Sequence, residues 1–470
     1  MMPPRARPHA HRLMRHEHGK FVEWFLAAGV LQEPSLSFNT ICVIGLGYIG
    51  LPTASTLAGH GASVLGVDVN ERVLETLRRG EIHIHEQGLR EMYREAIASG
   101  KLTVASKPAE ADAFIISVPT PFYEDKFGQH DGQEYKRADL RAVIAAAESI
   151  VPVLRRGNLV ILESTSPPRT TLDIVAPILE RSGLRAGKDF HLAYSPERVL
   201  PGQILRELKE NARVVGGVTP ESARRASELY RLFARGEIIE TDATTAELVK
   251  LMENTYRDVN IAIANEYSRL ADKFGVDVWE AISLANRHPR VNILNPGPGV
   301  GGHCISVDPW FLVEGAPGLT PLIASARRVN DSQPAFVVDV VKRVLGDLQG
   351  KHIAALGLAY KPNVDDVRES PAAEVVRLLE RDGAEVRAWE PFKTDADLPD
   401  ITLAESLDAA IGGAEAILLL VAHTEFASLN PLDVAGRTSA RVVIDAVNAW
   451  TAESWRKAGF TFVRLGAPHI

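Results

Sequence analysis

Cysteine is scarce in this chain, which has 2 cysteines in 470 residues. No uninterrupted apolar run approaches the ~20 residues that a membrane-spanning helix needs. Two cysteines cannot build a disulfide framework, which small secreted proteins commonly use to stabilise their folds. We therefore expect a cytoplasmic protein from a reducing compartment, with no membrane partner.

Charge of one sign is not in large excess, because 52 Lys and Arg residues face 60 Asp and Glu residues, for a net charge of -8. This acidic balance argues against nucleic acid as a partner. Hydrophobic residues at 46% and charged residues at 24% are typical of globular proteins and exclude wholesale disorder or a coiled-coil rod. At ~150 residues per domain, the length predicts about three domains.

Residues 1–38 differ from the rest of the chain. They begin with a stretch rich in Arg, His and Pro and continue into FVEWFLAAGVL, where Glu23 interrupts the apolar run that a signal peptide needs. The histidines lack the Cys/His spacing of a folded metal site, so we predict no bound metal. We expect residues 1–38 to form a disordered N-terminal extension.

From Ile41 onward, short apolar and β-branched runs alternate with helix-like segments, which is typical of a parallel sheet covered on both faces. The pattern turns helical after Thr219, and residues 244–275 are long enough to join two domains. The predicted class is α/β. It comprises two Rossmann-like wound parallel-sheet domains, at 39–218 and 331–470, and a helical central domain at 219–330 that we expect to dimerise.

The sequence Gly45-Leu46-Gly47-Tyr48-Ile49-Gly50 fits G-x-G-x-x-G between an apolar run and a helix-like segment. In a dinucleotide site the first glycine permits a tight turn, the second admits the pyrophosphate, and the third lets the helix pack on the strand. Asp68, at the end of the next predicted strand, can accept a hydrogen bond from a ribose 2′-OH, and its negative charge would repel a 2′-phosphate. The motif predicts NAD, although a glycine turn required only for packing would look the same.

Cys304 lies in a stretch dense in Pro and Gly, residues 287–310, which predicts a long loop. It follows the sequence GGH and precedes Asp308 by four residues. A thiol beside glycines is open to a substrate carbon and is strongly nucleophilic as thiolate. A single loop cysteine is nonetheless more often incidental than catalytic, so the case depends on its surroundings.

Lys250, Asn254 and Arg257 have the i, i+4, i+7 spacing of one face of the predicted central helix. Polar residues at this spacing commonly just face solvent and have no further role. Asparagine, however, is disfavoured inside helices and often marks a specific hydrogen bond. Helix and loop together offer a thiol nucleophile, a cation for an oxyanion and an amide that holds water. Further cations that would suit a polyanionic ligand are His288, Arg290, Lys361 and Arg368.

Together, these residues resemble the UDP-glucose/GDP-mannose dehydrogenase family from about Ile41 to Trp450. Within that family, PERVLPGQ and RHPRVNI favour the members that oxidise UDP-N-acetyl-D-mannosamine (UDP-ManNAc). The matching segments are VIGLGYIGLPTA, GEIHIHE, VPTPF, LVILESTSP, AYSPERVLPGQ, RDVNIAIANE, LANRHPRVNILNPGPGVGGHCISVDPWF and GLAYKPNVDDVRESPA.

The resemblance implies an NAD-dependent four-electron oxidation of the sugar C6 hydroxyl to a carboxylate, with Cys304 as nucleophile and Lys250 as acid/base or oxyanion-stabilising group. Asn254 and Asp308 would support them by positioning water. The implied NAD contacts, beside the three glycines, are Tyr48, Ile49, Asp68, Thr120, Thr165 and Arg368. The implied substrate contacts, some of them supplied by a neighbouring subunit, are Arg198, Val199, Lys250, Asn254, Arg257, His288, Arg290, Gly301, Tyr360 and Lys361.

Three alternatives stay open at this point. The same chemistry could act on UDP-GlcNAc or UDP-glucose, because a few pocket contacts decide which sugar fits. A two-electron hydroxyacid or polyol dehydrogenase would use Lys250 and Asn254 without Cys304 and release one NADH per substrate. A nucleotide-sugar sensor would bind both ligands without turnover, which the joint presence of Cys304, Lys250 and Asp308 argues against.

Overall fold

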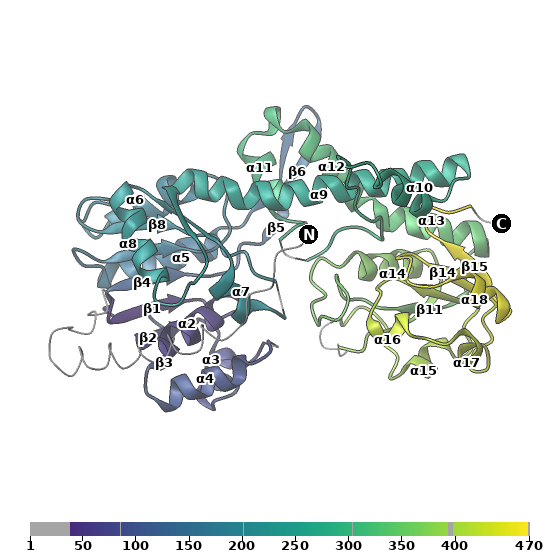
Figure 1. Ribbon diagram of the computed structural model, residues 1–470, viewed down its shortest axis with the longest axis horizontal. Helices are drawn as coiled ribbons and strands as arrows, with labels where there is room; N and C mark the ends of the chain where they lie inside the picture. Colours follow the sequence, from purple (N-terminus) through teal and green to yellow (C-terminus); the bar gives the residue numbers. More distant parts are fainter. Residues whose placement is uncertain (1–37, 85, 201, 303, 393–397, 469–470) are drawn as a thin grey trace, which may run out of the picture.

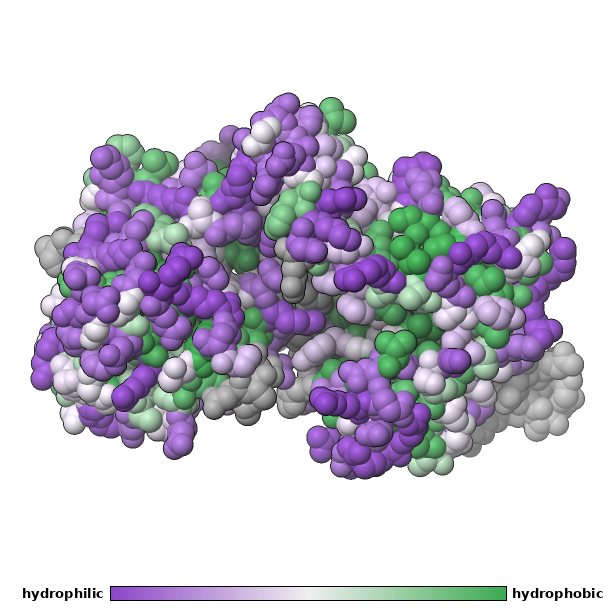
Figure 2. All heavy atoms as spheres, turned by 180° about the vertical axis from the view of Figure 1, so that it is seen from behind, coloured by the Kyte–Doolittle hydropathy of each residue, from purple (hydrophilic) through white to green (hydrophobic). Residues whose placement is uncertain are grey.

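The computed structural model describes residues 38–468 apart from 85, 201, 303 and 393–397. An N-terminal and a C-terminal sheet domain are joined by helices, of which α9 (Ala243–Phe274) spans most of the molecule (Figure 1). Seen from behind, the sheet domains form two lobes with a recess between them (Figure 2). The predicted α/β class, with two wound sheets and a long connecting helix, is confirmed.

The first sheet has the strand order β10-β9-β8-β7-β4-β1-β2-β3. Each neighbouring pair among β8, β7, β4, β1, β2 and β3 is parallel, whereas β9 pairs antiparallel with β8. Strands β4 and β7 are buried along their whole length, as expected when helices cover both faces. The strands are β1 (Thr40–Ile44), β2 (Ser63–Val67), β3 (Leu102–Ala105), β4 (Ala113–Ile116), β7 (Leu159–Leu162), β8 (His191–Tyr194), β9 (Arg213–Gly217) and β10 (Ile238–Asp242).

Two hydrophobic clusters lie on the two faces of this sheet. Phe38, which we had placed in the extension, is buried in one of them, and residues 1–37 lie outside the described part of the chain. The helical segments of the domain are α2 (Gly50–Gly59), α3 (Glu71–Arg78), α4 (Leu89–Ala98), α5 (Arg141–Ile150), the 3-10 turn η1 (Val151–Val153), the π-helical turn η2 (Thr171–Val175), α6 (Ala176–Glu180), α7 (Ile204–Glu210) and α8 (Pro220–Tyr230).

The first sheet continues beyond residue 218, where the sequence suggested that the domain ends. Helix α8 starts with Thr219 as N-cap and Pro220 in its first turn, and it packs on β9 and β10. The change to a helical pattern after Thr219 therefore marks one more covering helix, and the sheet ends only with β10. β9 and β10 also reverse the strand direction expected for an all-parallel sheet.

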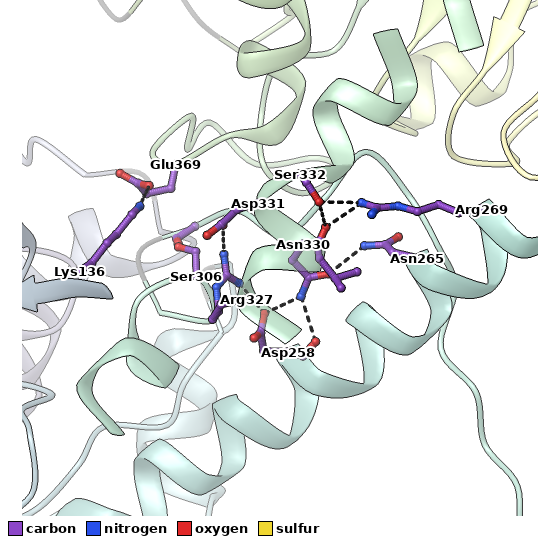
Figure 3. Close-up of polar contacts among 12 residues, drawn as sticks. Lys136, Asp258, Asn265, Arg269, Ser306, Arg327, Asn330, Asp331, Ser332 and Glu369 are labelled. Atoms are coloured by element: carbon purple, nitrogen blue, oxygen red, sulfur yellow. Dashed lines mark hydrogen bonds and ion pairs between the residues drawn. The ribbon is translucent and has the colours of Figure 1, made fainter. Parts of the chain in front are cut away.

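A two-stranded hairpin that the sequence analysis did not anticipate, β5 (Phe122–His130) and β6 (Gln133–Ala138), leaves the first domain. Asp131 and Gly132 form its turn, both with positive φ (49° and 75°), as a type I′ hairpin turn requires. The hairpin packs on α11 (Asp308–Gly315), and the Lys136 ammonium lies 3.7 Å from the Glu369 carboxylate in the third domain (Figure 3).

Helix α9 begins at an N-cap, Asp242, whose carboxylate accepts from the Thr245 N–H, and ends at Gly275 with φ of 69°. Its bounds agree closely with the predicted helix at 244–275. The other helices of the centre are α10 (Val278–Ala285), α11, the 3-10 turn η3 (Pro317–Leu319), α12 (Pro321–Asp331) and α13 (Gln333–Leu345). The described residues between α10 and α11 contain no helix or strand, as the Pro/Gly-rich sequence predicts.

The second sheet is parallel throughout, in the order β12-β11-β13-β14-β15. Its strands are β11 (His352–Leu356), β12 (Glu385–Trp389), β13 (Ala416–Leu419), β14 (Val442–Asp445) and β15 (Thr461–Arg464). Its helices are α14 (Pro371–Arg381), α15 (Leu407–Ile411), α16 (Thr424–Ala427), α17 (Pro431–Ala435) and α18 (Ala452–Lys457). Within the described residues, no helix has the length and apolar character needed to cross a bilayer.

Candidate active site

The glycine turn after β1 has the geometry of a dinucleotide cradle. Gly45 has φ of 93°, and a Cβ there would lie 2.4 Å from the Ser117 carbonyl oxygen. A Cβ on Gly50 would lie 1.8 Å from the Gly45 carbonyl oxygen, so the start of α2 packs directly on the turn. Gly47 is exposed, and a Cβ there would meet no atom within 4 Å. Two glycines thus serve the backbone path, and the third leaves open space for a ligand.

The acid at the end of β2 faces the same turn. The Asp68 carboxylate accepts hydrogen bonds from the N–H groups of Leu46 at 3.0 Å and Asn70 at 2.8 Å. Asp68 is nevertheless partly exposed. Ile49 precedes the first turn of α2 and offers no side-chain cap to its free N–H groups. Unpaired N–H groups at a helix start favour a phosphate.

Thr120 and Thr165 follow β4 and β7, neighbouring parallel strands, so both lie at the edge of the sheet that carries the glycine turn. The Ser164 hydroxyl accepts the Val118 N–H at 2.9 Å and donates to the Val118 carbonyl at 2.7 Å. This pair of bonds ties the two loops together beside the cradle. Ligands of wound sheets bind at this edge.

Cys304 lies one turn before α11. Its carbonyl oxygen accepts the N–H groups of Val307 at 3.1 Å and Asp308 at 2.8 Å, so the cysteine is fixed to the start of that helix. Burial raises the pKa of the Cys304 thiol to about 11, with the cations of Lys250 and Arg368 opposing the shift. The residue keeps partial exposure, whereas Cys42 is fully buried in β1.

Helix α9 delivers two of the predicted residues to Cys304 and Asp308. The Asn254 amide donates to the Asp308 carboxylate at 2.6 Å, and both side chains are buried. Burial raises the pKa of Asp308 to about 6, and Lys250 and the Asn254 hydrogen bond limit the rise. The charge of Lys250 acts on both the thiol and this carboxylate. A thiol, a cation, an amide and a carboxylate are thereby gathered in one place.

A buried polar cluster that the sequence analysis missed holds Lys250. The Lys250 ammonium donates to the Glu197 carbonyl oxygen at 2.9 Å, and the Glu197 carboxylate pairs with the Arg213 guanidinium at 2.7 Å. Arg213 also lies 4.0 Å from Glu163, which accepts the Tyr230 hydroxyl at 2.7 Å. Burial raises the pKa of Glu163 to about 7. The sequence signal was available, because Glu163 directly follows the apolar strand LVIL and Arg213 opens RVVGG.

The third domain closes the site from the other side. A Cβ on Gly301 would lie 2.6 Å from the Glu369 carbonyl oxygen and 2.8 Å from the Tyr360 Cβ. The Gly302 N–H donates to the Arg368 carbonyl at 3.0 Å. Only glycines allow the cysteine loop to approach the segment after β11 this closely.

That segment also reaches the glycine turn of the first domain. The Arg368 guanidinium lies 5.5 Å from the centre of the Tyr48 ring and pairs with Asp366, and the Tyr48 hydroxyl donates to Asp365 at 3.4 Å. Tyr48 and Arg368, both predicted cofactor contacts, therefore lie together between the two sheets.

The remaining candidates are partly or fully exposed. Arg198 pairs with Glu253 of α9 at 2.6 Å, and Val199 packs on the hydrophobic cluster that contains Phe38. Arg257 is exposed, because the buried stripe of α9 continues from Asn254 through Asp258. His288 and Arg290 are exposed after α10, and Lys361 is partly exposed beside Tyr360.

Models of three domains match the chain, all from the UDP-glucose/GDP-mannose dehydrogenase family. The NAD binding domain matches residues 39–234, the central domain 244–332, and the UDP binding domain 354–452. The chain belongs to this family. It is an NAD-dependent nucleotide-sugar dehydrogenase, and a UDP-sugar is its class of substrate. NAD fits the first domain, where Gly47 leaves the backbone open and Asp68 remains accessible for a ribose.

Relatives of known name agree with this family. The chain is 49% identical to the UDP-N-acetyl-D-mannosamine dehydrogenase of Methanocaldococcus jannaschii, over 91% of this chain and 96% of the relative. It is 47% identical to an NDP-N-acetyl-D-galactosaminuronic acid dehydrogenase of Ralstonia solanacearum, over 89% and 98%. The solved UDP-D-ManNAc dehydrogenase of Pyrococcus horikoshii is 40% identical, with a TM-score of 0.83 over 92% of this chain and 100% of that one.

Proposed function

We propose that this family member oxidises the C6 hydroxyl of UDP-ManNAc to the carboxylate in two NAD-dependent steps, through a thioester on Cys304. The observation that carries the proposal is the gathering of the Cys304 thiol, Lys250 and the Asn254–Asp308 pair in one site. An alcohol dehydrogenase that removes two electrons needs no such thiol. The sugar is proposed from the named relatives and from the PERVLPGQ and RHPRVNI segments.

Cys304 acts on the aldehyde formed by the first oxidation. NAD, when bound, takes up the hydride released from carbon in each oxidation. The Cys304 sulfur bonds to the aldehyde carbon, and the thiol proton passes to the aldehyde oxygen, giving a thiohemiacetal. Lys250 stabilises the oxyanion during this addition and moves the proton. Loss of a hydride and of the hydroxyl proton then leaves the thioester.

Hydrolysis of the thioester needs an activated water, which we assign to Asn254 and Asp308. With a pKa of about 6, Asp308 is ionised at neutral pH and can take a proton from water. Attack of that water breaks the C–S bond, releases the carboxylate and restores the Cys304 thiol. Per sugar, one water and two NAD are consumed.

The other predicted residues are assigned to binding. NAD would be held by Gly45, Gly47, Tyr48, Ile49, Gly50, Asp68, Thr120, Thr165 and Arg368. The UDP-sugar would be held by Arg198, Val199, Lys250, Asn254, Arg257, His288, Arg290, Gly301, Tyr360 and Lys361. Because the oxidised sugar stays attached to UDP, it remains an activated donor, and we assign the product to surface polysaccharide synthesis starting in the cytoplasm.

The ratio of NADH formed to UDP-ManNAc consumed tests the number of oxidations. We expect two, and a ratio of one would remove the thioester mechanism. Cys304→Ser should abolish acid formation while NAD and UDP-ManNAc still bind, as measured by calorimetry. Normal turnover by this variant would disprove the nucleophile role.

A panel of sugars tests the substrate. We expect the highest kcat/KM with UDP-ManNAc when UDP-GlcNAc and UDP-glucose are measured alongside. UDP-N-acetylgalactosamine belongs in the panel, because a relative at 47% identity is named for the galacto product. Equal values for all four sugars, or a preference for another, would overturn the assignment of the sugar but not of the reaction.

A homodimer through α9 completes the proposal. Seven exposed apolar residues lie at helical spacing on the side of α9 opposite its buried stripe: Leu248, Met252, Tyr256, Ile263, Tyr267, Leu270 and Phe274. Tyr256 and Phe274 are 70% and 73% exposed, which is unusual for aromatic side chains and favours a covering partner. Light scattering should report a dimer for the wild type and a monomer for Tyr256→Glu, and an unchanged mass would contradict this interface.

A further inference from the structure

The Pro/Gly-rich loop that precedes Cys304, residues 296–302, rests on a buried polar chain between α9 and α12 (Figure 3). The Gly297 N–H donates to the Asn265 side-chain oxygen at 3.0 Å. A Cβ on Gly299 would lie 3.1 Å from the Asn330 carbonyl oxygen. The loop therefore contacts the two helices at two points before it reaches Gly301 and Gly302 against the third domain.

Asn265 belongs to a chain of four buried side chains. Its amide nitrogen donates to the Asn330 side-chain oxygen at 2.9 Å, and the Asn330 nitrogen donates to the Asp258 carboxylate at 2.7 Å and to the Asp258 carbonyl at 3.0 Å. The Arg327 guanidinium pairs with the same carboxylate at 2.5 Å. All four residues are at most 1% exposed.

The direction of every bond in this chain follows from its charged end. The Asp258 carboxylate, paired with Arg327, can only accept, so Asn330 must turn its NH₂ group toward Asp258. The Asn330 oxygen then faces Asn265, which must donate with its own NH₂ group. The Asn265 oxygen is left facing the loop, where the Gly297 N–H can only donate. A reversed amide at either asparagine would leave buried donors or acceptors unpaired, which costs about 1–3 kcal/mol for each group.

We propose that Asn265 is a positioning residue for Cys304, acting through its bond to Gly297, and that the Asp258–Arg327 pair fixes its orientation through Asn330. A buried ion pair is weak evidence for stability, but it can enforce one arrangement among several. Here the enforced arrangement presents an acceptor to the loop that carries the nucleophile. The effect of Asn265 on turnover rests on the proposed function, whereas its effect on the accessibility of the Cys304 thiol to alkylation does not.

Asn265→Ala removes the acceptor and tests the proposal. The kcat for UDP-ManNAc should fall by on the order of 10-fold to 100-fold, because misplacing a reacting group by about 1 Å costs up to ~100-fold. The KM for NAD should stay within about twofold, because the cradle at Gly47 is untouched. Alkylation of Cys304 by iodoacetamide, followed by mass spectrometry, should become several-fold faster as the loop loosens. Buried Cys42 serves as an internal reference.

Arg269→Gln is the matched control. Arg269 also joins α9 to the helices beyond it, through the Val329 carbonyl and Ser332, but it makes no bond to the loop. It should lower the thermal stability to a similar degree without changing the alkylation of Cys304 or kcat. If Arg269→Gln speeds alkylation as much as Asn265→Ala does, the effect is general loosening and the proposal is wrong.

Gly297 provides a second pair of variants that leaves the helix interface intact. A Cβ at Gly297 meets no atom within 4 Å, so Gly297→Ala keeps the N–H and should behave as wild type. Gly297→Pro removes the N–H and should reproduce Asn265→Ala. Wild-type alkylation and kcat in Gly297→Pro and Asn265→Ala would overturn the proposal. A wild type that leaves UDP-ManNAc unoxidised would overturn the proposed function alone, because alkylation still reports on the loop.

Discussion

Asp308→Asn should separate stability from activity, because burial makes the carboxylate costly to ionise. The pKa of Asp308 is raised from 3.8 to about 6. At 1.36 kcal/mol per pKa unit, the ionised group destabilises the folded protein at neutral pH by about 3 kcal/mol relative to its protonated form. Asparagine resembles the protonated acid and can still accept the Asn254 hydrogen bond. We therefore expect the variant to be more stable than wild type at pH 7.5.

The sign of the pH dependence follows from the direction of the shift. A raised pKa means that the folded protein binds the proton more tightly than the unfolded chain does. Protonation of Asp308 therefore stabilises the folded protein fully below pH 3.8, and this stabilisation is lost as the pH rises through about 6. The gain from Asp308→Asn should therefore be largest above pH 6 and should shrink as the pH falls toward 4.

Thermal unfolding at pH 7.5 and at pH 4.5 measures this difference. A gain of about 3 kcal/mol corresponds to a rise in Tm of roughly 6–12 °C for a domain of about 150–250 residues. Activity should fall sharply in the same variant, because asparagine cannot accept a proton from water.

Asp189 is the control of opposite sign. Its pKa is lowered, chiefly by the Arg185 backbone N–H, so Asp189→Asn should be less stable than wild type at pH 7.5. A destabilised Asp308→Asn at pH 7.5 would refute the reasoning.

Two further pairs of variants test the cradle and the cluster behind Lys250. Gly50→Ala should unfold at lower temperature and lose NAD binding because its Cβ would overlap the Gly45 carbonyl, whereas Gly47→Ala should melt as wild type and raise only the KM for NAD. Arg213→Met should cost about 3–5 kcal/mol in urea unfolding, because it leaves two buried carboxylates without their cation. Arg224→Met, which breaks ion pairs of an exposed arginine, should cost far less than Arg213→Met, and equal losses would contradict the ranking.

Much of the fold was predictable because its strands are short, apolar and separated by clear helical patterns. Strands β3, β10 and β15, which the sequence analysis does not anticipate, are the outermost strands of their sheets, and polar residues border β3 and β10, so the apolar pattern there is weaker. The β5–β6 hairpin carried a usable signal in Asp131-Gly132, but its strands, YEDKFGQH and QEYKR, are too polar to show alternation.

The site was predictable where one local motif sets the geometry and less so where distant segments meet. Helical spacing placed Lys250 and Asn254 beside each other, but it could not show that Arg257 faces solvent, because the buried stripe of α9 drifts toward Asp258. Nor could it show that the Glu197 carbonyl holds Lys250, since that contact joins residues 53 positions apart. Burial against a tertiary neighbour decides both, and a single helix does not encode it.

The second sheet shows how such neighbours change the meaning of a motif. Gly357, with φ of 89°, stands after β11 as Gly45 stands after β1, and Glu390 follows β12 as Asp68 follows β2. Yet Glu390 is 4% exposed and accepts the N–H groups of Leu358 and Ala359 at 2.7 and 2.9 Å.

His423, itself fully buried, covers the same carboxylate at 3.1 Å. The acid that could bind a ribose in one sheet is therefore occupied with its own turn in the other. Asp68 keeps partial exposure beside an open Gly47, whereas Glu390 fills its turn from within. The same strand, turn and acid thus provide a cofactor cradle in the first domain. In the third domain they fix the backbone of the segment that carries Tyr360, Lys361 and Arg368.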